Sequence, residues 1–509
     1  MGEYKPTIGL EIHAELNTRT KMFCDSKNDP DETRPNVNIC PVCTAHPGTL
    51  PVINKEAVRH VLRVGKALGG TIADFTEFDR KNYFYPDIPK GYQISQYEYP
   101  LVKGGYLQIP IFGEQTENKN SKFQILPMAK PSRILGTVGT NSNKIEITRV
   151  HLEEDTARSI HGDKGQGTRD KECSLVDFNR AGVPLMELVT EPVITSAKQA
   201  GDFARELQLL VRYLGASEAN MEKGQMRVEA NVSVSKDTTR GTKVEIKNLN
   251  SFRVVERAIA YEIARQSEVL EGGGHVVQET RGWDEGKQET FSQRMKESAA
   301  DYRYFPDPDL PKLKISEIEE FKNIELPELP WEKRTRYKKD YGIKDEDIEV
   351  FVADDTLGIF FENVVAAQRG DVAKAKIAAN YITSDVQGLR AKTRATFMMS
   401  PEAFAELVGM VMAGEISSRG AKDILALMYT LGDAPRALAE KHGLLQKSDR
   451  GELAAIVDAV IAKNAQAVEE YKNGKDASLQ FLIGQGMRES RGSANPGVLG
   501  KLLKERLGR

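Results

Sequence analysis

A proline-rich stretch, FPDPDLPKLKISEIEEFKNIELPELPW at residues 305–331, divides this chain into two parts. Proline fixes φ and has no backbone N–H, so neither a long helix nor a central strand continues through five prolines. Before this stretch apolar and polar residues alternate, as in strands, and after it the apolar residues recur at helical spacing. We therefore expect an α+β protein, with an N-terminal cradle domain built on a largely antiparallel sheet and all-helical C-terminal domains.

The same signals predict the domain boundaries. A length of 509 residues exceeds what one hydrophobic core supports. In the first part the clearest helix begins at Ser196, has Gln199 at the capping-box position and ends at Gly215. We predict a cradle domain at 1–310, a linker at 311–331, a helical domain at 332–399 and a helical tail domain at 400–509.

Charge and hydropathy narrow the possible functions. The net charge is -3, so any contact with nucleic acid must be local. Residues 485–509 hold six Lys or Arg against two Glu, a net +4, which is either a phosphate-binding surface or a solvated helix face. No apolar run reaches the roughly 18 residues of a membrane span, and the N-terminus lacks an apolar signal core. We expect a cytoplasmic protein with no membrane contact.

Four predicted strands each have one apolar face and one polar face, because side chains alternate along a strand. The polar faces hold Glu11 and His13 in IGLEIHAEL, His151 and Glu153 in RVHLEE, Arg227 and Glu229 in RVEANVSV, and Glu245 and Lys247 in KVEIKNLNSF. One such face alone indicates only solvation. Together they collect Glu, His, Arg and Asn, and carboxylates with a histidine suit a hard cation such as Mg²⁺.

Glu187 lies inside the apolar run VPLMELVTEP. A buried carboxylate is costly unless it is paired or binds a metal. Glu187 therefore needs a cationic partner, which is either a metal ion or an arginine such as Arg180.

A magnesium ion in turn suggests a phosphate ligand. Candidates to hold phosphate oxygens are Arg80, Lys81, Arg227 and Lys247. No G-x-x-x-x-G-K-[ST] motif occurs, so a nucleotide would bind through carboxylates, metal and side chains on a sheet. The aromatic residues in RKNYFYPDIPKGYQISQ (80–96) and DYRYFPDPD (301–309) either stack on a base or fasten these loops to the core.

Eight segments, taken in order, resemble the B subunit of the heterotrimeric aspartyl/glutamyl-tRNA(Asn/Gln) amidotransferases. They are IGLEIHAEL, CPVCTAHPGTLPVIN, DRKNYFYPDIPKGYQISQ, RVHLEEDTA, SLVDFNRAGVPLMELVTEP, RVEANVSV, EIKNLNSF and DYRYFPDPDLP. The end of the chain, with NGKDASLQFLIGQGM and ANPG, resembles the tail domain of that family. The resemblance covers nearly the whole chain, and eight motifs in order are very specific.

The resemblance implies a carbon–nitrogen ligase that uses glutamine as amide donor. Such an enzyme uses ATP and Mg²⁺ to phosphorylate the side-chain carboxylate of Asp on tRNA(Asn) or Glu on tRNA(Gln), and ammonia then displaces the phosphate. The implied partners are an amidase (glutaminase) that supplies ammonia, a small third protein that wraps the other two, and the misacylated tRNA. The tail domain would grip the tRNA, so the basic segment 485–509 is interpreted as a phosphate contact.

The resemblance also implies roles for individual residues. The implied magnesium ligands are Glu11, His13, Glu154, Glu187 and Glu229. The implied catalytic residues are Glu11, His13, His151, Glu154, Glu229 and Lys247. We assign ATP binding to Arg80, Lys81, Arg227 and Asn248. Strand alternation alone would select Glu153, so the choice of Glu154 rests on the resemblance; His151, Glu153 and Asp155 would then orient the ion indirectly.

The cysteines depart from the family pattern of Cys-x-Cys followed by Cys-x-x-Cys. The first pair has Ser26 in place of one cysteine, and Cys173 is expected to be a lone thiol. Either the site has been lost, or Zn²⁺ is held by Cys24, Cys40, Cys43 and His46.

Two other functions use the same residues. A metal-dependent hydrolase would apply the acidic, histidine-containing cleft to water without ATP or tRNA. A non-catalytic RNA-binding adaptor would need only charge on its sheet. The histidine and asparagine of the polar faces disfavour this adaptor function.

Overall fold

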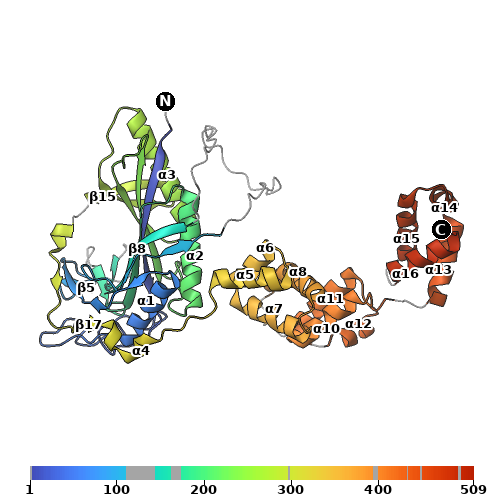
Figure 1. The fold of residues 1–509 in the computed structure, drawn as a ribbon, viewed down its shortest axis with the longest axis horizontal. Helices are drawn as coiled ribbons and strands as arrows, with labels where there is room; N and C mark the ends of the chain where they lie inside the picture. Colours follow the sequence, from blue (N-terminus) through green and yellow to red (C-terminus); the bar gives the residue numbers. More distant parts are fainter. Residues whose placement is uncertain are drawn as a thin grey trace, which may run out of the picture. The chain divides into compact units, whose positions relative to one another are not determined.

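The computed structural model describes residues 3–110, 144–161, 174–295, 299–393, 399–432, 434–446, 450–490 and 494–508. The chain forms two compact units, Met1–Pro330 and Trp331–Arg509 (Figure 1). The division falls at the end of the proline-rich stretch. That stretch is no free linker over its first part, because its strand β17 (Leu313–Lys314) pairs with β3 (Phe75–Thr76) of the first unit.

The first unit is built on a ten-stranded sheet, in the order β15-β14-β13-β12-β1-β11-β8-β6-β2, with β7 paired to β8. Every neighbouring pair is antiparallel except β13 and β14, so the expectation of a largely antiparallel sheet is confirmed. The strands are β1 (Lys5–Glu15), β2 (Thr71–Ile72), β6 (Val102–Lys103), β7 (Tyr106–Gln108), β8 (Lys144–Glu154), β11 (Pro184–Thr190), β12 (Met226–Ser235), β13 (Val244–Leu249), β14 (Glu279–Asp284) and β15 (Glu289–Met295).

Besides the β17–β3 pair, two smaller sheets belong to the described part of the same unit. The first joins β16 (Phe305–Pro306), β4 (Asp79–Asn82) and β5 (Tyr92–Ser95) and pairs Phe305 with Arg80. It thereby brings the two aromatic segments of the sequence together. The second joins β9 (Arg158–His161) and β10 (Ser174–Asp177).

Three long helices occur in the described part of the first unit, where the sequence showed clearly only one. They are α1 (Lys55–Ala67), α2 (Ala197–Tyr213) and α3 (Phe252–Glu271). The expected start of α2 is confirmed, because the Ser196 side chain accepts a hydrogen bond from the Gln199 N–H, and Gly215 follows its end with φ 62°. Helix α3 packs on α2 and on strands β12 and β13, where Val228, Ala230 and Ile246 are fully buried. The helices thus cover the apolar face of these strands, and the short elements η1 (Ala299–Tyr302), η2 (Ile315–Glu317) and α4 (Glu319–Lys322) follow later in the chain.

The second unit is helical throughout its described part, as expected. Its elements are α5 (Pro330–Tyr341), α6 (Asp345–Ala353), α7 (Asp355–Ala367), α8 (Val372–Tyr381), the π-helix η3 (Ile382–Val386), α9 (Gln387–Lys392), α10 (Pro401–Met412), α11 (Ser418–Leu431), α12 (Pro435–Lys441), α13 (Arg450–Lys463), α14 (Ala465–Lys472), α15 (Asp476–Glu489) and α16 (Pro496–Leu507). Ser400 and Asn495 cap the N-termini of α10 and α16. The last four helices share one core, around Leu453, Leu482 and Leu499. Within the described residues no helix is long and apolar enough to cross a membrane.

Candidate functional site

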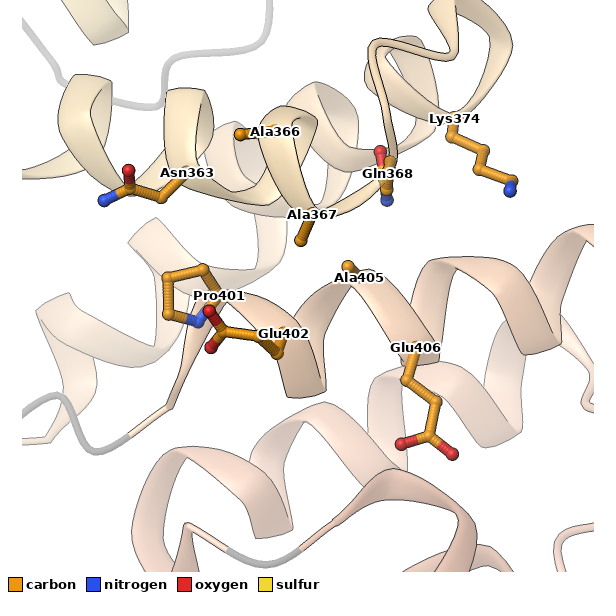
Figure 2. A pocket seen from close by; sticks show the side chains of 9 residues that line it. All are labelled: Asn363, Ala366, Ala367, Gln368, Lys374, Pro401, Glu402, Ala405 and Glu406. Atoms are coloured by element: carbon orange, nitrogen blue, oxygen red, sulfur yellow. The ribbon is translucent and has the colours of Figure 1, made fainter.

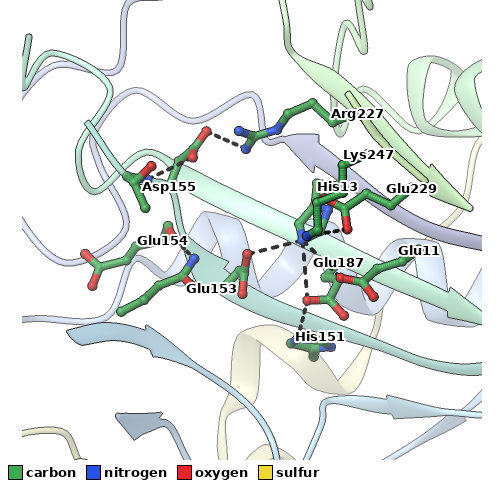
Figure 3. Close-up of polar contacts among 12 residues, drawn as sticks. Glu11, His13, His151, Glu153, Glu154, Asp155, Glu187, Arg227, Glu229 and Lys247 are labelled. Atoms are coloured by element: carbon green, nitrogen blue, oxygen red, sulfur yellow. Dashed lines mark hydrogen bonds and ion pairs between the residues drawn. The ribbon is translucent and has the colours of Figure 1, made fainter. Parts of the chain in front are cut away.

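Strand register brings the predicted acidic and histidine residues together on the polar face of the sheet. On one side of β1, Glu11 pairs with Glu229 of β12. On the other side, His13 pairs with Glu187 of β11, which in turn pairs with His151 of β8. Residues directly opposite in an antiparallel pair project from the same face. These side chains therefore converge over the middle of the sheet (Figure 3).

His13 lies at the centre of this cluster. Its Nε2 is 3.4 Å from Glu187 Oε2, 3.5 Å from Glu153 Oε1 and 3.9 Å from Glu11 Oε1. Burial opposes a charge on His13, but the hydrogen bond to Glu187 and the charges of Glu153 and Glu11 raise its pKa to about 9. We therefore expect His13 to carry a proton at neutral pH when only protein groups surround it.

Glu187 has cationic partners on two sides. Its Oε2 is 3.3 Å from His151 Nε2, and its Oε1 is 3.4 Å from Arg149 Nη2. Burial favours the protonated acid, but His151 and His13 hold the pKa of Glu187 well below its usual value. The expected partner Arg180 lies elsewhere, with its Nε 3.6 Å from Asp155.

A second group of acids surrounds Glu11. One ligand atom each from Glu11, Glu229 and Glu245 lies within 4.8 Å of the others. Burial, followed by repulsion from Glu187 and Glu229, raises the pKa of Glu11 to about 7. Lys247 offsets this charge with its Nζ 2.8 Å from Glu229 Oε2.

The residue after Lys247 does not join the cluster. The β12–β13 register shifts between Val228 and Ala230, and Asn248 on the partner strand has a left-handed φ of 62°, as in a β-bulge. Its side chain is exposed. The predicted contact of Asn248 with ATP stays a prediction.

Lys81 places a partly buried cation near the cluster. Burial alone would lower its pKa, but the charges of Glu153 and Glu187 are among those that raise it well above the usual value. Its Nζ lies 5.1 Å from the centre of the Tyr302 ring. Of the predicted phosphate-binding residues, Lys81 thus senses the charges of Glu153 and Glu187, and Lys247 contacts Glu229 directly.

The predicted ligand Glu154 lies apart from the cluster. The Glu154 carboxylate binds the Lys90 ammonium and accepts a hydrogen bond from the Ile94 N–H at 3.0 Å. Its neighbour Glu153 faces His13 instead, because successive strand residues point to opposite faces. The structure thus supports the alternation argument for Glu153 and does not bring Glu154 to the cluster. Sequence reasoning did not select Lys90.

Arg80 and Arg227 are already paired. Arg80 forms ion pairs with Asp307 and Asp309, both at 2.8 Å, so its guanidinium fastens β4 to the segment after β16. Arg227 Nη2 is 2.7 Å from Asp155 Oδ2. Arg80 is thus held by two acids, and Arg227 lies beside the cluster with a third of its side chain exposed. The predicted ATP contacts of both arginines stay predictions.

The cluster fits a divalent cation chemically. Glu11, His13 and Glu187, and separately His151, Glu153 and Glu187, each offer ligand atoms within 4.8 Å of one another. Glu153 Oε2 and His151 Nδ1 are buried and have no hydrogen-bond partner among the described residues. Such unpaired buried atoms are costly, and a hydrated cation would satisfy them.

Three of the four predicted zinc ligands converge. One sulfur each from Cys24, Cys40 and Cys43 lies within 4.8 Å of the others, whereas His46 is not in this group. A buried ammonium, Lys21 Nζ, is 3.6 Å from Cys43 Sγ. The pKa of the Cys43 thiol is lowered to about 4 by the hydrogen bond from Cys24 and by the Lys21 cation. Burial of the thiol acts in the opposite direction. The structure thus groups three of the four predicted zinc ligands, the zinc site that includes His46 stays a prediction, and Cys173 lies outside the described residues.

A hollow of about 750 Å³ lies in the second unit between α7 and α10 (Figure 2). Its walls include Ala366, Ala367 and Ala405, and the charged ends of Lys374 and Glu406 point away from the gap between the helices. The described lining also includes Glu402 but contains no histidine, unlike the cluster on the sheet.

Comparison with known proteins agrees with this fold and site. The sequence profile of the GatB/GatE catalytic domain matches residues 6–320, and that of the GatB domain matches residues 359–507. The α+β unit with its carboxylate–histidine cluster therefore belongs to the GatB/GatE class of catalytic domains.

Full-length relatives give the particular family. A protein of Gloeothece citriformis is 42% identical over 99% of this chain and 98% of its own length. One of Carboxydothermus hydrogenoformans is 41% identical over 100% and 99%, and one of Persephonella marina is 42% identical over 99% and 100%. Each is named as the B subunit of an aspartyl/glutamyl-tRNA(Asn/Gln) amidotransferase. The chain belongs to this family of amidotransferase B subunits.

Proposed function

We propose that this chain is the component that amidates misacylated tRNA in an ATP-dependent amidotransferase. Its substrates are Asp-tRNA(Asn), Glu-tRNA(Gln) or both, and glutamine is the source of ammonia. The observation that carries this proposal is the buried cluster of Glu11, His13, Glu153 and Glu187 on the sheet, in a chain that is similar over its full length to named B subunits.

The proposed reaction needs little covalent participation by protein side chains. Transfer of a phosphoryl group to a carboxylate needs alignment and cations that offset the developing charge. Lys81 and Lys247 supply fixed positive charge at the cluster. His13, His151 and Arg149 hold Glu187 in place.

The proposed cofactors are ATP and Mg²⁺. Glu11, His13, Glu153 and Glu187 would hold the ion, with Glu229 next to Glu11. Bound Mg²⁺ supplies positive charge to phosphate oxygens. Because an ion and a proton compete for the same groups, His13 must lose its proton to act as a ligand. Zinc at Cys24, Cys40, Cys43 and His46 stays a prediction.

The proposed partners are the amidase (glutaminase) of the same enzyme, its small third protein and the misacylated tRNA. The second unit would contact the tRNA through its basic C-terminal segment. In this segment Lys501 and Lys504 lie on α16, Arg506 pairs with Asp458 at 3.2 Å, and Arg491 and Arg509 lie outside the described residues.

The test uses the chain co-purified with its amidase and small partner proteins. Glu-tRNA or Asp-tRNA, Mg²⁺, ATP and glutamine are supplied, and the amino acid on the tRNA is followed. We expect amide formation that requires ATP and is lost in Glu11→Gln while tRNA binding persists. The matched control is Glu146→Gln, an exposed acid on β8 outside the cluster. Unchanged amino acid on both tRNAs with ATP untouched would contradict the proposal and favour the hydrolase.

A further inference from the structure

A wall of tyrosines leads from the protein surface to Lys81, and the role proposed for the acidic cluster leaves it unexplained. We define the tyrosine wall as Tyr97, Tyr304 and Tyr302. The Tyr97 and Tyr304 rings are stacked, with centroids 4.2 Å apart and an interplanar angle of 10°. Tyr302 meets Tyr304 edge-on at 6.0 Å.

The inner end of the wall reaches the cluster. Burial raises the pKa of the Tyr304 phenol; the Lys81 cation opposes this rise, and the charges of Glu153 and Glu187 add to it. The geometric link is Tyr302, whose ring centre lies 6.0 Å from that of Tyr304 and 5.1 Å from Lys81 Nζ.

The backbone under Tyr304 is held in an unusual conformation. The preceding residue, Arg303, has a left-handed φ of 44°, which costs a non-glycine residue free energy. The Asn82 side chain compensates by donating hydrogen bonds to the carbonyl oxygens of Arg303, at 2.8 Å, and Tyr302, at 3.3 Å. Strain of this kind concentrates at functional sites.

The outer end of the wall is also fixed but is open to solvent. Buried Asp79 accepts hydrogen bonds from the Tyr97 N–H at 2.9 Å and the Glu98 N–H at 3.3 Å. Tyr97 is nevertheless 45% exposed, although one face of its ring rests on Tyr304. A rigidly held, exposed aromatic ring is an established platform for a nucleobase.

We propose that the stacked Tyr97–Tyr304 pair is the subsite for an adenine ring. This inference rests on the proposed function, whose two substrates, ATP and the 3′ end of tRNA, both carry adenosine. A base on Tyr97 directs its ribose along the wall toward Lys81 and the acids. The phosphates of ATP, or the amino acid esterified to the tRNA, then lie at the cluster.

The experiment measures binding and turnover of the assembled complex with Tyr97→Ala and Tyr97→Phe. Calorimetric Kd and KM are determined separately for ATP and for aminoacylated tRNA. Loss of base stacking should weaken one of the two substrates by about 5- to 150-fold in Tyr97→Ala. Tyr97→Phe keeps the ring and should stay within about twofold of the parent.

The affected substrate identifies the source of the base. A change confined to ATP assigns the subsite to the nucleotide. A change confined to tRNA, absent for tRNA that lacks its terminal adenosine, assigns it to the 3′ end. The matched control is Tyr99→Ala, because Tyr99 is 40% exposed but packs edge-on against Phe75 at 5.0 Å.

Three results would overturn the inference: unchanged affinity for both substrates, an equal loss in Tyr97→Phe, or failure of Tyr97→Ala to assemble with the partner proteins. The last would show that a neighbouring protein covers the ring. A parent complex that binds ATP but forms no amide would refute the proposed function and leave the Kd comparison able to decide the subsite.

Discussion

Asp155→Asn should destabilise the first unit by leaving Arg227 without its anionic partner. The Asp155 side chain is 3% exposed, and its Oδ2 lies 2.7 Å from Arg227 Nη2. Breaking a buried ion pair on one side costs about 3–5 kcal/mol. The Arg227 side chain is 32% exposed, so water screens part of its charge, and we expect the lower value of about 2–3 kcal/mol.

The assay is urea unfolding followed by tryptophan fluorescence. The chain has two tryptophans; a Trp331→Phe background leaves Trp283, on β14 of the same sheet, to report on the first unit alone. Asp155→Asn, Arg227→Met and the double variant form a double-mutant cycle. We expect a coupling of about 2 kcal/mol, and a coupling below about 0.5 kcal/mol would refute the reasoning.

The pH dependence has a definite sign. Burial works against ionisation of Asp155, but Arg227 and Arg180 lower its pKa below the usual value. Its stabilising effect is therefore complete above the unfolded-state pKa of about 3.9 and is lost as the pH falls through the lower, folded-state pKa. The penalty of Asp155→Asn should accordingly shrink in acid.

Three further predictions concern the active cluster and the helical unit. Glu187→Gln removes the negative charge that two histidines and an arginine contact, so kcat for amidation should fall at least about 100-fold. The affinity for tRNA, measured by filter binding, should stay within about twofold. Retained turnover would contradict this prediction. Glu362→Gln should cost the second unit about 1 kcal/mol at pH 7, because Glu362 accepts hydrogen bonds from Arg336 at 2.6 Å and Tyr337 at 2.8 Å. These hydrogen bonds lower the pKa of Glu362 against the effect of burial. An equal cost of the substitution in urea unfolding at pH 3 would therefore count against the assignment. Leu482→Ala opens a cavity in the fully buried core of the last four helices and should cost about 2–5 kcal/mol, seen as faster amide hydrogen exchange in α13–α16 but not in α5–α8.

Alternation along strands revealed much of the site without a structure. It placed Glu11, His13, Glu229 and Lys247 on one polar face because a two-residue period is a local property of the chain. It also favoured Glu153 over the adjacent acid, in agreement with the observed contact to His13. Which acids meet across strands depends on register, which sequence alternation alone does not give.

Other features depend on long-range contacts. From the sequence, Arg80 was predicted to be available to phosphate. In the structure it pairs with Asp307 and Asp309, which lie more than 200 residues further along the chain. Helix α3 begins at Phe252, with only Asn250 and the capping residue Ser251 between it and the end of β13 at Leu249, and it was not predicted from the sequence. The tyrosine wall likewise exists only because β16 pairs with β4.

The most direct test of the account follows the oxygen atoms of the substrate. Glutamate labelled with ¹⁸O in its side-chain carboxylate is loaded on tRNA and converted by the complex with ATP, Mg²⁺ and glutamine. If the carboxylate is phosphorylated before ammonia displaces the phosphate, one labelled oxygen per amide formed must leave in inorganic phosphate. Unlabelled phosphate alongside amide formation would contradict carboxylate activation by this chain.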